Sequence, residues 1–363
     1  MRFSVVALAA FVCAAVAHPG HDLTEEIAER RAFKASTRRS TLEHCASKLQ
    51  ARGVEARNVA RRAAAMKRLR ARSLDSDLAT DHNETSKGYS TNTPETELFS
   101  SNNSCVLTPE VTDGPYYVSG EFVRSDIKET QAGVPLTVDY QVIDVDTCEP
   151  VPNHFVEIWH CNATGVYSGV SGSQGGLNTT FLRGIQETDD DGVAQFTTIF
   201  PGHYTGRATH IHVLVHTNGT LLPNGTIGHD TTAMHVGQAF FDQTLISAVE
   251  ATSPYTLNEQ TLTENTDDDI LASEADTDGV DPLMEYTMLG DTIADGLFAW
   301  LSFGVNTSYA SAASAAALYY ADGGVENANG LSSSPQSSNS TVPQFNGTVP
   351  QFNGTVPLFN STA

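Results

Sequence analysis

The chain has 363 residues, which is enough for a large core and one or two domains. Its formal net charge is −23 at pH 7, yet fourteen of its 20 Lys and Arg residues lie between Arg30 and Arg72. The body beyond Leu74 is therefore strongly acidic, which excludes a nucleic-acid-binding role for it because it would repel phosphate backbones and other anionic surfaces.

Residues 1–17 are predicted to form a secretory signal peptide. Arg2 precedes an apolar run over residues 4–16, and the stretch Ala15-Val16-Ala17 fits a small-residue cleavage site. The run is too short to span a membrane comfortably, and no other stretch reaches about 18 apolar residues. We therefore expect a secreted, extracellular protein that does not contact a membrane.

The cysteines and glycosylation acceptors agree with export. Four cysteines follow the predicted signal peptide, and the sequence leaves their three pairings open: Cys45, Cys105, Cys148 and Cys161. Cys148 and Cys161 flank one predicted strand, which would hold them too far apart to bond. Eleven N-x-S/T acceptors predict N-linked glycans, at Asn83, Asn102, Asn162, Asn178, Asn218, Asn224, Asn306, Asn339, Asn346, Asn353 and Asn360.

Residues 18–75 are predicted to be helical, because they are rich in Ala, Leu, Glu, Lys and Arg. We expect these basic helices to dock on the acidic body, to form a homodimer contact, or to act as a prosegment that is clipped near the basic pairs. Residues 76–103 are polar and aperiodic, and are predicted to be a linker or surface arm.

The pattern changes to strands in the predicted domain over residues 104–308. Short apolar runs alternate with Gly, Pro, Asp and Asn turns, which favours a β-sandwich or barrel over βαβ units. The predicted strands cover residues 134–145, 153–160, 192–200, 210–216 and 236–241.

Residues 309–363 are predicted to be a low-complexity, glycosylated and disordered tail. The stretch SYASAASAAALYYADGG has the composition of a short helix or strand, and a seven-residue repeat, V-P-Q/L-F-N-G/S-T, follows it. Such a Ser, Asn, Gly and Pro composition cannot build a core.

The segment RATHIHVLVH presents the first candidate for a metal site. On a strand, His210 and His212 would point the same way with Cα atoms roughly 6.5–7 Å apart, close enough to bind one ion. A carboxylate beside two histidines would indicate ferrous iron, and a third His or a Cys would indicate zinc. No Asp or Glu flanks THIHV, but Tyr204 stands just upstream and Tyr167 lies on a Gly-bracketed loop. Phenolates suit a hard, strongly Lewis-acidic ion, so this set points to ferric iron.

Another set of histidines leaves a zinc alternative open. His154 and His160 share one face of a predicted strand, and His216 shares a face with His210 and His212. His203 adjoins Tyr204 and is expected only to tune its loop.

Taken together, the segments IWHCNATGVY, FPGHYTGRATHIH and VGQAFF resemble the intradiol ring-cleavage dioxygenases, and most closely their secreted fungal branch. The resemblance covers roughly residues 104 to 305. It implies an all-β core, a Greek-key and prealbumin-like β-sandwich, flanked here by the N-terminal helical segment and the disordered C-terminal tail. It also implies an Fe(3+) cofactor, a small aromatic diol and O2 as substrates, and ring opening between the two hydroxyls to muconic-type diacids.

The same resemblance assigns roles to single residues. It makes Tyr167, Tyr204, His210 and His212 the iron ligands, with Tyr204 also taking a proton from the diol. Arg207 matches the arginine that steadies charge on the substrate, and Gln238 matches a glutamine on the oxygen side of the pocket. Tyr116 or Tyr117 is expected to contact the substrate ring. The loop between Tyr204 and His210 is shorter than in the bacterial catechol enzymes, so the Gly/Ser-rich segment 168–184 is expected to shape the mouth of the pocket.

A second hypothesis is a secreted β-sandwich that binds ligands or cell-wall material without catalysis. The two tyrosines distinguish the hypotheses, because a binding module has no need of phenols at these positions.

Overall fold

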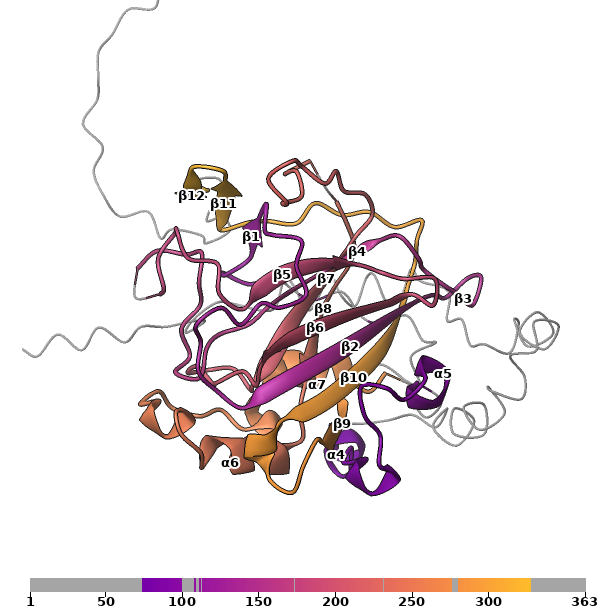
Figure 1. The fold of residues 1–363 in the computed structure, drawn as a ribbon, viewed down its shortest axis with the longest axis vertical. Coiled ribbons are helices and arrows are strands. Elements are labelled where there is room, and N and C mark those ends of the chain that lie inside the picture. Colours follow the sequence, from indigo (N-terminus) through magenta and orange to yellow (C-terminus); the bar gives the residue numbers. More distant parts are fainter. Residues whose placement is uncertain are drawn as a thin grey trace, which may run out of the picture.

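The computed structural model describes residues 74–99, 108, 111, 113–172, 174–230, 232–275 and 280–327 (Figure 1). The predicted signal peptide, most of the predicted helices over 18–75 and the repeats of the tail lie outside the described residues. The dimer contact, the prosegment and the disorder of the repeats therefore stay predictions.

The described chain is mostly β-sheet with few helices, as the all-β prediction requires. One sheet has the order β3-β2-β10-β9, with β6 also paired to β2. Its strands are β2 (Pro135–Asp144), β3 (Glu149–Pro150), β6 (Val193–Ile199), β9 (Glu285–Met288) and β10 (Leu297–Val305). The second sheet has the order β5-β4-β7-β8, formed by β4 (Phe155–Trp159), β5 (Arg183–Glu187), β7 (His210–His216) and β8 (Ala233–Phe240). All five strands that the sequence predicted are present within a few residues of their expected ends.

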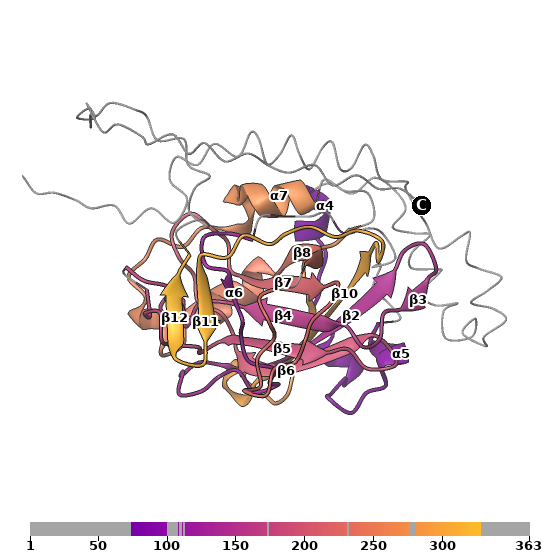
Figure 2. The same ribbon diagram turned by 90° about the horizontal axis from the view of Figure 1, so that it is seen from above.

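One hydrophobic core lies between the two sheets, which Figure 2 shows as neighbouring layers. Alternate residues of β2 enter it, for example Leu136 and Val138, because successive side chains of a strand point to opposite faces. From the second sheet, Ile158 and Ile211 meet them. The two-residue period thus assigns one face of each strand to the core and leaves the other face for other partners.

β10 is the main element that the sequence analysis did not predict. It runs parallel to β2, with Leu297 opposite Leu136, and antiparallel to β9. Every residue of β10 is buried, so its sequence LFAWLSFGV reads as a continuous apolar run rather than as an alternating strand. Such a run cannot be told from a buried helix by its period alone.

The folded part extends past residue 308, which corrects the predicted start of the tail. β11 (Ala317–Tyr320) and β12 (Gly323–Glu326) form a hairpin, and β11 pairs in parallel with β1 (Val118–Ser119). This hairpin lies at the top of the molecule in Figure 1. Ala317 is fully buried with Val118, so this end of the tail has an apolar partner that its composition alone did not reveal.

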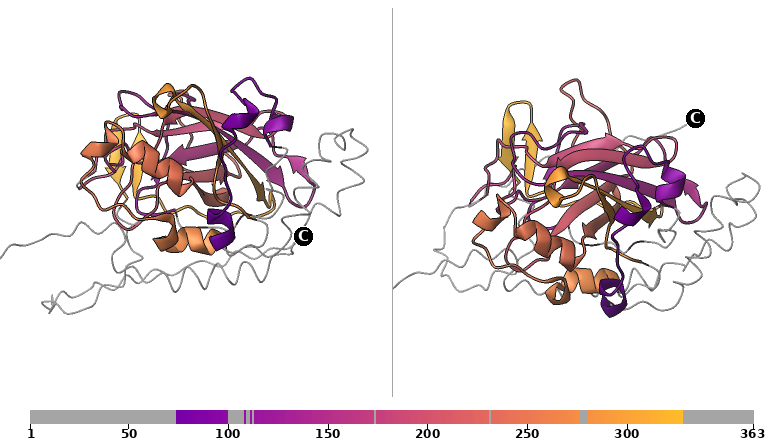
Figure 3. Two further views of the ribbon diagram at one scale, coloured as in Figure 1. Left: turned by 90° about the horizontal axis from the view of Figure 1, so that it is seen from below. Right: turned by 60° about the horizontal axis from the view of Figure 1, so that its bottom comes forward.

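Residues 76–99 are not the predicted surface arm, because several of their side chains are buried. Leu98 and Phe99 pack with Phe298 and Trp300 on the outer face of β10. The described helices are all short: α4 (Leu74–Leu78), η2 (Thr85–Lys87), α5 (Glu95–Leu98), α6 (Gln243–Glu250), η3 (Tyr255–Leu257), η4 (Asn265–Asp267), α7 (Asp269–Ala275) and η5 (Ile293–Asp295). Figure 3 shows α4 beside α7, which places the start of the described chain next to a late segment.

The described residues hold two cysteines, and they are not bonded to each other. Cys161 is a buried free thiol, whereas Cys148 forms a disulfide whose partner is therefore outside the described residues. The prediction that these two cysteines do not bond to each other is confirmed. None of the described helices has the length and apolar character to cross a membrane.

A buried ion triad fastens residues 74–99 to the body. His82 Nδ1 lies 2.6 Å from Asp242 Oδ1, and His82 Nε2 lies 3.1 Å from Asp281 Oδ2. Burial alone would lower the pKa of His82, but the two carboxylates raise it to about 10. His82 is therefore a cation at neutral pH, held between two anions.

We predict that His82→Gln lowers the free energy of unfolding by about 3–5 kcal/mol at pH 6, because it leaves two buried carboxylates without their cation. The pKa is higher in the folded chain than its usual value near 6.5, so the difference from the wild type is full below pH 6.5 and disappears as the pH rises through about 10. Urea unfolding of both proteins between pH 5 and pH 10 measures it. A difference that does not change with pH would contradict this account.

Candidate metal centre

His210 and His212 of β7 lie on the face of the second sheet that is turned away from the main core. Ile211 and Val213 enter the main core, while Leu214 packs in a second cluster outside it with Tyr167 and Tyr204. The alternation of a strand therefore gives His210 and His212 to this outer face, as expected. Both are 2% exposed, because loops cover this face of the sheet. The site therefore lies on a covered sheet face and not at the edge of the sandwich.

The two imidazoles face each other through their Nε2 atoms, which are 3.0 Å apart. His210 Nδ1 lies 2.6 Å from the carbonyl oxygen of Ala208, so Nδ1 donates its hydrogen there and Nε2 keeps the lone pair. Two nitrogens that each lie about 2.1 Å from one ion, at about a right angle, are about 3.0 Å apart. This pair thus has the spacing of two neighbouring ligands of one metal.

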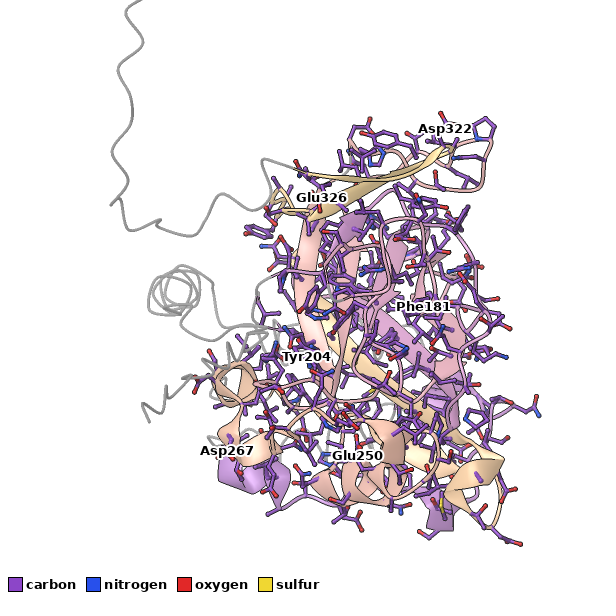
Figure 4. The ribbon with its side chains drawn as sticks, turned by 90° about the vertical axis from the view of Figure 1, so that its left-hand side faces the viewer. Phe181, Tyr204, Glu250, Asp267, Asp322 and Glu326 are labelled. Atoms are coloured by element: carbon purple, nitrogen blue, oxygen red, sulfur yellow. The ribbon has the colours of Figure 1, made fainter. Side chains whose placement is uncertain are left out.

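Both predicted tyrosines meet these histidines. Tyr204 Oη is 3.4 Å from His210 Nε2. The ring of Tyr167 lies 5.6 Å from that of Tyr204 and 6.3 Å from that of His212, measured between centroids. The structure therefore brings all four predicted ligands together. Figure 4 shows Tyr204 between the hairpin that carries Asp322 and the segment that carries Asp267.

Each tyrosine lies on a loop whose backbone is fixed by hydrogen bonds. Tyr167 lies between β4 and β5, where its N–H donates to Gln174 Oε1 at 2.7 Å and its carbonyl accepts from Gly175 N at 2.7 Å. The turn of Tyr204 is tied to residues 258–268, since Asn258 Nδ2 donates to the carbonyl of His203 at 2.8 Å. These bonds fix both phenols before any ligand arrives.

The chemistry of the four donors decides which ion fits. Burial raises the pKa of both phenols above the ordinary value near 10, and Arg207 opposes that rise at Tyr204. Tyr167 Oη interacts with Tyr204, but no described residue meets it with hydrogen-bond geometry. Neutral, poorly paired phenols in a dry site gain most from a hard, highly charged cation that ionises them. The residues present therefore fit a ferric ion, because two phenolates and a hydroxide would cancel its charge.

Arg207 is buried beside the ligands and is fixed by two partners. Its Nε donates to Asp268 Oδ2 at 2.8 Å, and a terminal nitrogen donates to Gln238 Oε1. Gln238 lies directly opposite His212 in the β7–β8 pair, so both side chains are on the site face. The amide nitrogen of Gln238 is buried and has no hydrogen-bond partner among the described residues. The structure thus brings Arg207 and Gln238 together at one side of the ligand cluster.

Asp268 is a functional candidate that the sequence analysis missed. Its Oδ2 also accepts from Ala208 N at 2.7 Å, and its Oδ1 accepts the first free N–H groups of α7, from Ile270 and Leu271, at 2.9 Å each. Burial would raise the pKa of Asp268, but the Arg207 guanidinium and these donors hold it below its ordinary value. An Asp before a helix is a common capping residue, so this role of Asp268 could be read from the sequence. Its ion pair with Arg207, 61 residues away in the chain, could not.

Only one of the two predicted substrate-contact tyrosines reaches the ligands. Tyr116 stacks on Tyr167 with 4.4 Å between ring centroids and an interplanar angle of 24°. Tyr117 is 2% exposed and packs instead against Trp159, at 5.1 Å. Gln174 of the Gly/Ser-rich segment approaches Tyr116 Oη at 3.4 Å, so this segment borders the site as expected.

Two close packing partners of His212 were also missed. Trp159 lies parallel to its imidazole, with 4.7 Å between centroids and 5° between planes. A Cβ atom on Gly114 would meet His212 Cε1 at 3.3 Å, so glycine lets the backbone approach the ring at that point. The sequence placed Trp159 on the same face of a predicted strand as Glu157, two residues earlier. It did not show that Trp159 would pack on His212.

The remaining histidines do not assemble the alternative zinc site. His160 is fully engaged by the carbonyl of Cys161 and by Thr198 Oγ1, both at 2.8 Å, and His216 bonds to Glu157. His203 bonds to Glu250 and to the carbonyl of Gln260, which supports its expected role in the loop of Tyr204. In the part of the chain that the structure describes, no three His, Cys, Asp or Glu side chains converge as metal ligands. The candidate centre is therefore made of two histidines and two tyrosines.

Known proteins agree with this class of site. The family model Dioxygenase_C, described as Dioxygenase, matches residues 112–220. Catechol 1,2-dioxygenase 1 of Acinetobacter lwoffii is 31% identical over 133 residues, which are 30% of this chain and 42% of the relative. A catechol 1,2-dioxygenase of Pseudomonas sp. strain EST1001 is 34% identical over 102 residues, 27% of this chain and 32% of the relative. The chain thus spans less than half the length of these relatives.

A solved structure matches over its whole length. The intradiol ring-cleavage dioxygenase from Tetranychus urticae is 30% identical, and the match covers 56% of this chain and 97% of that protein, with a TM-score of 0.48. The family model and the curated relatives define the class of the matched segment. Residues 112–220 belong to the dioxygenase family, and the curated proteins similar to this part of the chain are catechol 1,2-dioxygenases.

We predict that Asp268→Ala destabilises the metal-free protein by about 3–5 kcal/mol, because it strands a buried guanidinium and removes the cap of α7. The pKa of Asp268 is depressed in the folded chain, so its contribution is full above pH 5 and is lost as the pH falls below about 4. Urea unfolding between pH 3 and pH 7 measures the difference. Asp267→Ala, at the exposed neighbouring residue, is the control and should change stability by less than about 0.5 kcal/mol. Equal losses in the two variants would contradict the assigned role.

Proposed function

We propose that this protein is a secreted, non-haem Fe(III) dioxygenase that cleaves catechol-type ortho-diols between their hydroxyls and yields muconic-type diacids. The observation that carries the proposal is the convergence of two buried phenols on two imidazole Nε2 atoms 3.0 Å apart. Membership of the dioxygenase family supports the reaction class. The Greek-key, prealbumin-like connectivity and the affinity to the fungal branch are part of the same proposal.

The residues would divide the work as follows. Tyr167, Tyr204, His210 and His212 would hold ferric iron, which when bound supplies Lewis acidity toward the diol and the redox chemistry for its reaction with O2. Tyr204 Oη would receive one diol proton. His210 keeps its coordinating nitrogen unprotonated by donating from Nδ1 to Ala208.

Three further side chains would act on the substrate. Tyr116 lies half-buried over Tyr167 and can stack on an aromatic ring. Arg207, already oriented by Asp268, would stabilise negative charge that develops on the opening ring. The amide nitrogen of Gln238 is a donor on the same side, next to His212. The burial of the site keeps water from competing for these groups.

The non-catalytic alternative is not favoured. A binding module would not need a fully buried phenol such as Tyr167 that lacks a hydrogen-bond partner among the described residues. The relatives found are dioxygenases as well.

The decisive test combines metal analysis with oxygen uptake on catechol. The purified full chain should contain about one iron per chain and be reddish, because ferric tyrosinate absorbs visible light. Tyr204→Phe should lose at least about 100-fold in kcat with catechol, the size of a lost acid–base group. Among the described residues, the hydroxyl of the core residue Tyr140 meets only Met284, at 3.8 Å. Tyr140→Phe is therefore the control and should keep both iron and activity. A colourless protein, absence of oxygen uptake, or full activity in Tyr204→Phe would each overturn the proposal.

Secretion is supported by the disulfide of Cys148 and by exposed acceptor asparagines such as Asn218 and Asn224. Asn162 differs in being half-buried close to Tyr167, where its Oδ1 accepts from Thr164 N at 3.0 Å and from Val166 N at 3.1 Å. Its Nδ2 donates to Gln131 Oε1 at 3.1 Å.

We predict that the folded protein, secreted from a eukaryotic host, carries N-linked glycans at Asn218 and Asn224 and none at Asn162. The reason is that a glycan on Asn162 would displace the bonds that shape this loop. Glycopeptide mass spectrometry measures the occupancy at each acceptor. Full occupancy of Asn162 in active protein would contradict the prediction.

A further inference from the structure

One row of side chains crosses the second sheet and includes two predicted site residues. Arg183 of β5 lies opposite Trp159 of β4, Trp159 lies opposite His212 of β7, and His212 lies opposite Gln238 of β8. Directly opposite residues of antiparallel strands point to the same face. Arg183 therefore stands on the site face, at the far end of the row from Gln238.

The guanidinium of Arg183 is directed at the loop of Tyr167. Its Nη2 donates to the carbonyl oxygen of Ser168 at 2.7 Å, and its Nε lies 3.0 Å from Ser168 Oγ and 3.2 Å from the same carbonyl. Its central carbon lies 6.0 Å from the centroid of the Tyr167 ring. A Cβ atom on Gly169 would approach Arg183 Nε to 3.3 Å, and the φ of +71° at Gly169 already disfavours any other residue. The backbone at Ser168 and Gly169 therefore packs directly against the Arg183 side chain.

The guanidinium of Arg183 makes its hydrogen bonds to a loop residue rather than to a carboxylate. The side chain is 1% exposed, which costs several kcal/mol of desolvation. Its nearest carboxylate, Glu121, is 3.8 Å away and accepts no hydrogen bond from it. Burial raises the pKa of Glu121 to about 8 although Arg183 opposes the rise, so Glu121 is largely neutral at pH 7. All the hydrogen bonds that the guanidinium makes within the described chain go to Ser168.

We propose that Arg183 is a positioning residue that fixes Tyr167 for the metal by clamping the adjoining Ser168 peptide with a two-nitrogen fork. The inference rests on the proposed function and deepens it, since the phenol of Tyr167 must face the two imidazoles to be a ligand. A planar fork sets the direction of the Ser168 carbonyl, and this peptide sets where the Tyr167 side chain points. Lysine cannot reproduce the clamp, because it has a single charged nitrogen.

The test measures metal binding and the visible spectrum, without relying on turnover. Metal-free wild type, Arg183→Lys and Arg183→Met are titrated with ferric nitrilotriacetate, and the tyrosinate absorption band is recorded. We expect both variants to bind iron at least about tenfold more weakly and to show a shifted, weaker band, as for other residues that orient metal ligands. Arg124→Lys is the matched control. Arg124 donates to the carbonyls of Thr180 and Arg183, at the end of the loop next to β5, and within the described chain none of its hydrogen bonds goes to Tyr167 or Ser168. This variant should match the wild type in both measurements.

A double-mutant cycle separates positioning from general damage. If Arg183 acts through Tyr167, then Arg183→Lys should not weaken iron binding further in a Tyr167→Phe background. Ser168→Ala removes the hydroxyl partner of Arg183 and the bond of that hydroxyl to the carbonyl of Phe181, but it keeps the Ser168 carbonyl. It should fold if the arginine variants do not, and should shift the band in the same direction by a smaller amount.

The outcomes distinguish this inference from the proposed function. If the wild type binds no ferric iron, the proposed function fails. If the wild type binds iron but the Arg183 and Arg124 variants behave alike, or if the loss is the same in the Tyr167→Phe background, only the role of Arg183 is overturned.

Discussion

The two-residue period of β7 is the constraint on which the rest of this structure depends. One side of the strand, with Ile211, Val213 and Val215, closes the core between the sheets. The other side carries His210, His212 and His216, which cannot be left buried without polar or metal partners. A second layer must therefore cover this face and satisfy it. The loops of Tyr167 and Tyr204, together with β1 and β11, provide that layer.

The covering layer explains why the site is made from loops yet is held rigidly. The Tyr204 turn is tied to residues 258–268, and the Tyr167 loop to Arg183 and Gln174. The fixed sheet supplies the imidazoles, and the parallel contact with Trp159 sets the plane of one of them. Ligands that are fixed in this way lose little conformational freedom on metal binding, which favours affinity for the ion.

The positive charges of the two buried arginines at the site, Arg207 and Arg183, are compensated in different ways. At the Arg207 end, Asp268 forms a close ion pair and caps α7, so the cation is fully compensated. At the Arg183 end, the nearest carboxylate is largely neutral, and the guanidinium bonds to a peptide group instead. In the proposed function, Arg207 would thus act on the substrate, whereas Arg183 would position the ligand Tyr167. Both arginines are buried, whereas the other described Lys and Arg residues are half-buried or exposed: Lys87, Arg124 and Lys128.

The sequence by itself determined the periodicity of five strands, the pairing of His210 with His212 on one face, and the tyrosines that suit a ferric ion. These are local properties, because the alternation of a strand and the chemical type of a side-chain donor depend on only a few neighbouring residues. It did not reveal β10, the burial of Leu98 and Phe99, or the folding of residues 309–327 against β1, because each depends on an apolar partner far away in the chain. Only the tertiary structure brought Asp268 to Arg207 and Arg183 behind Tyr167, since these contacts exist only after the sheets have packed and the loops have closed over them.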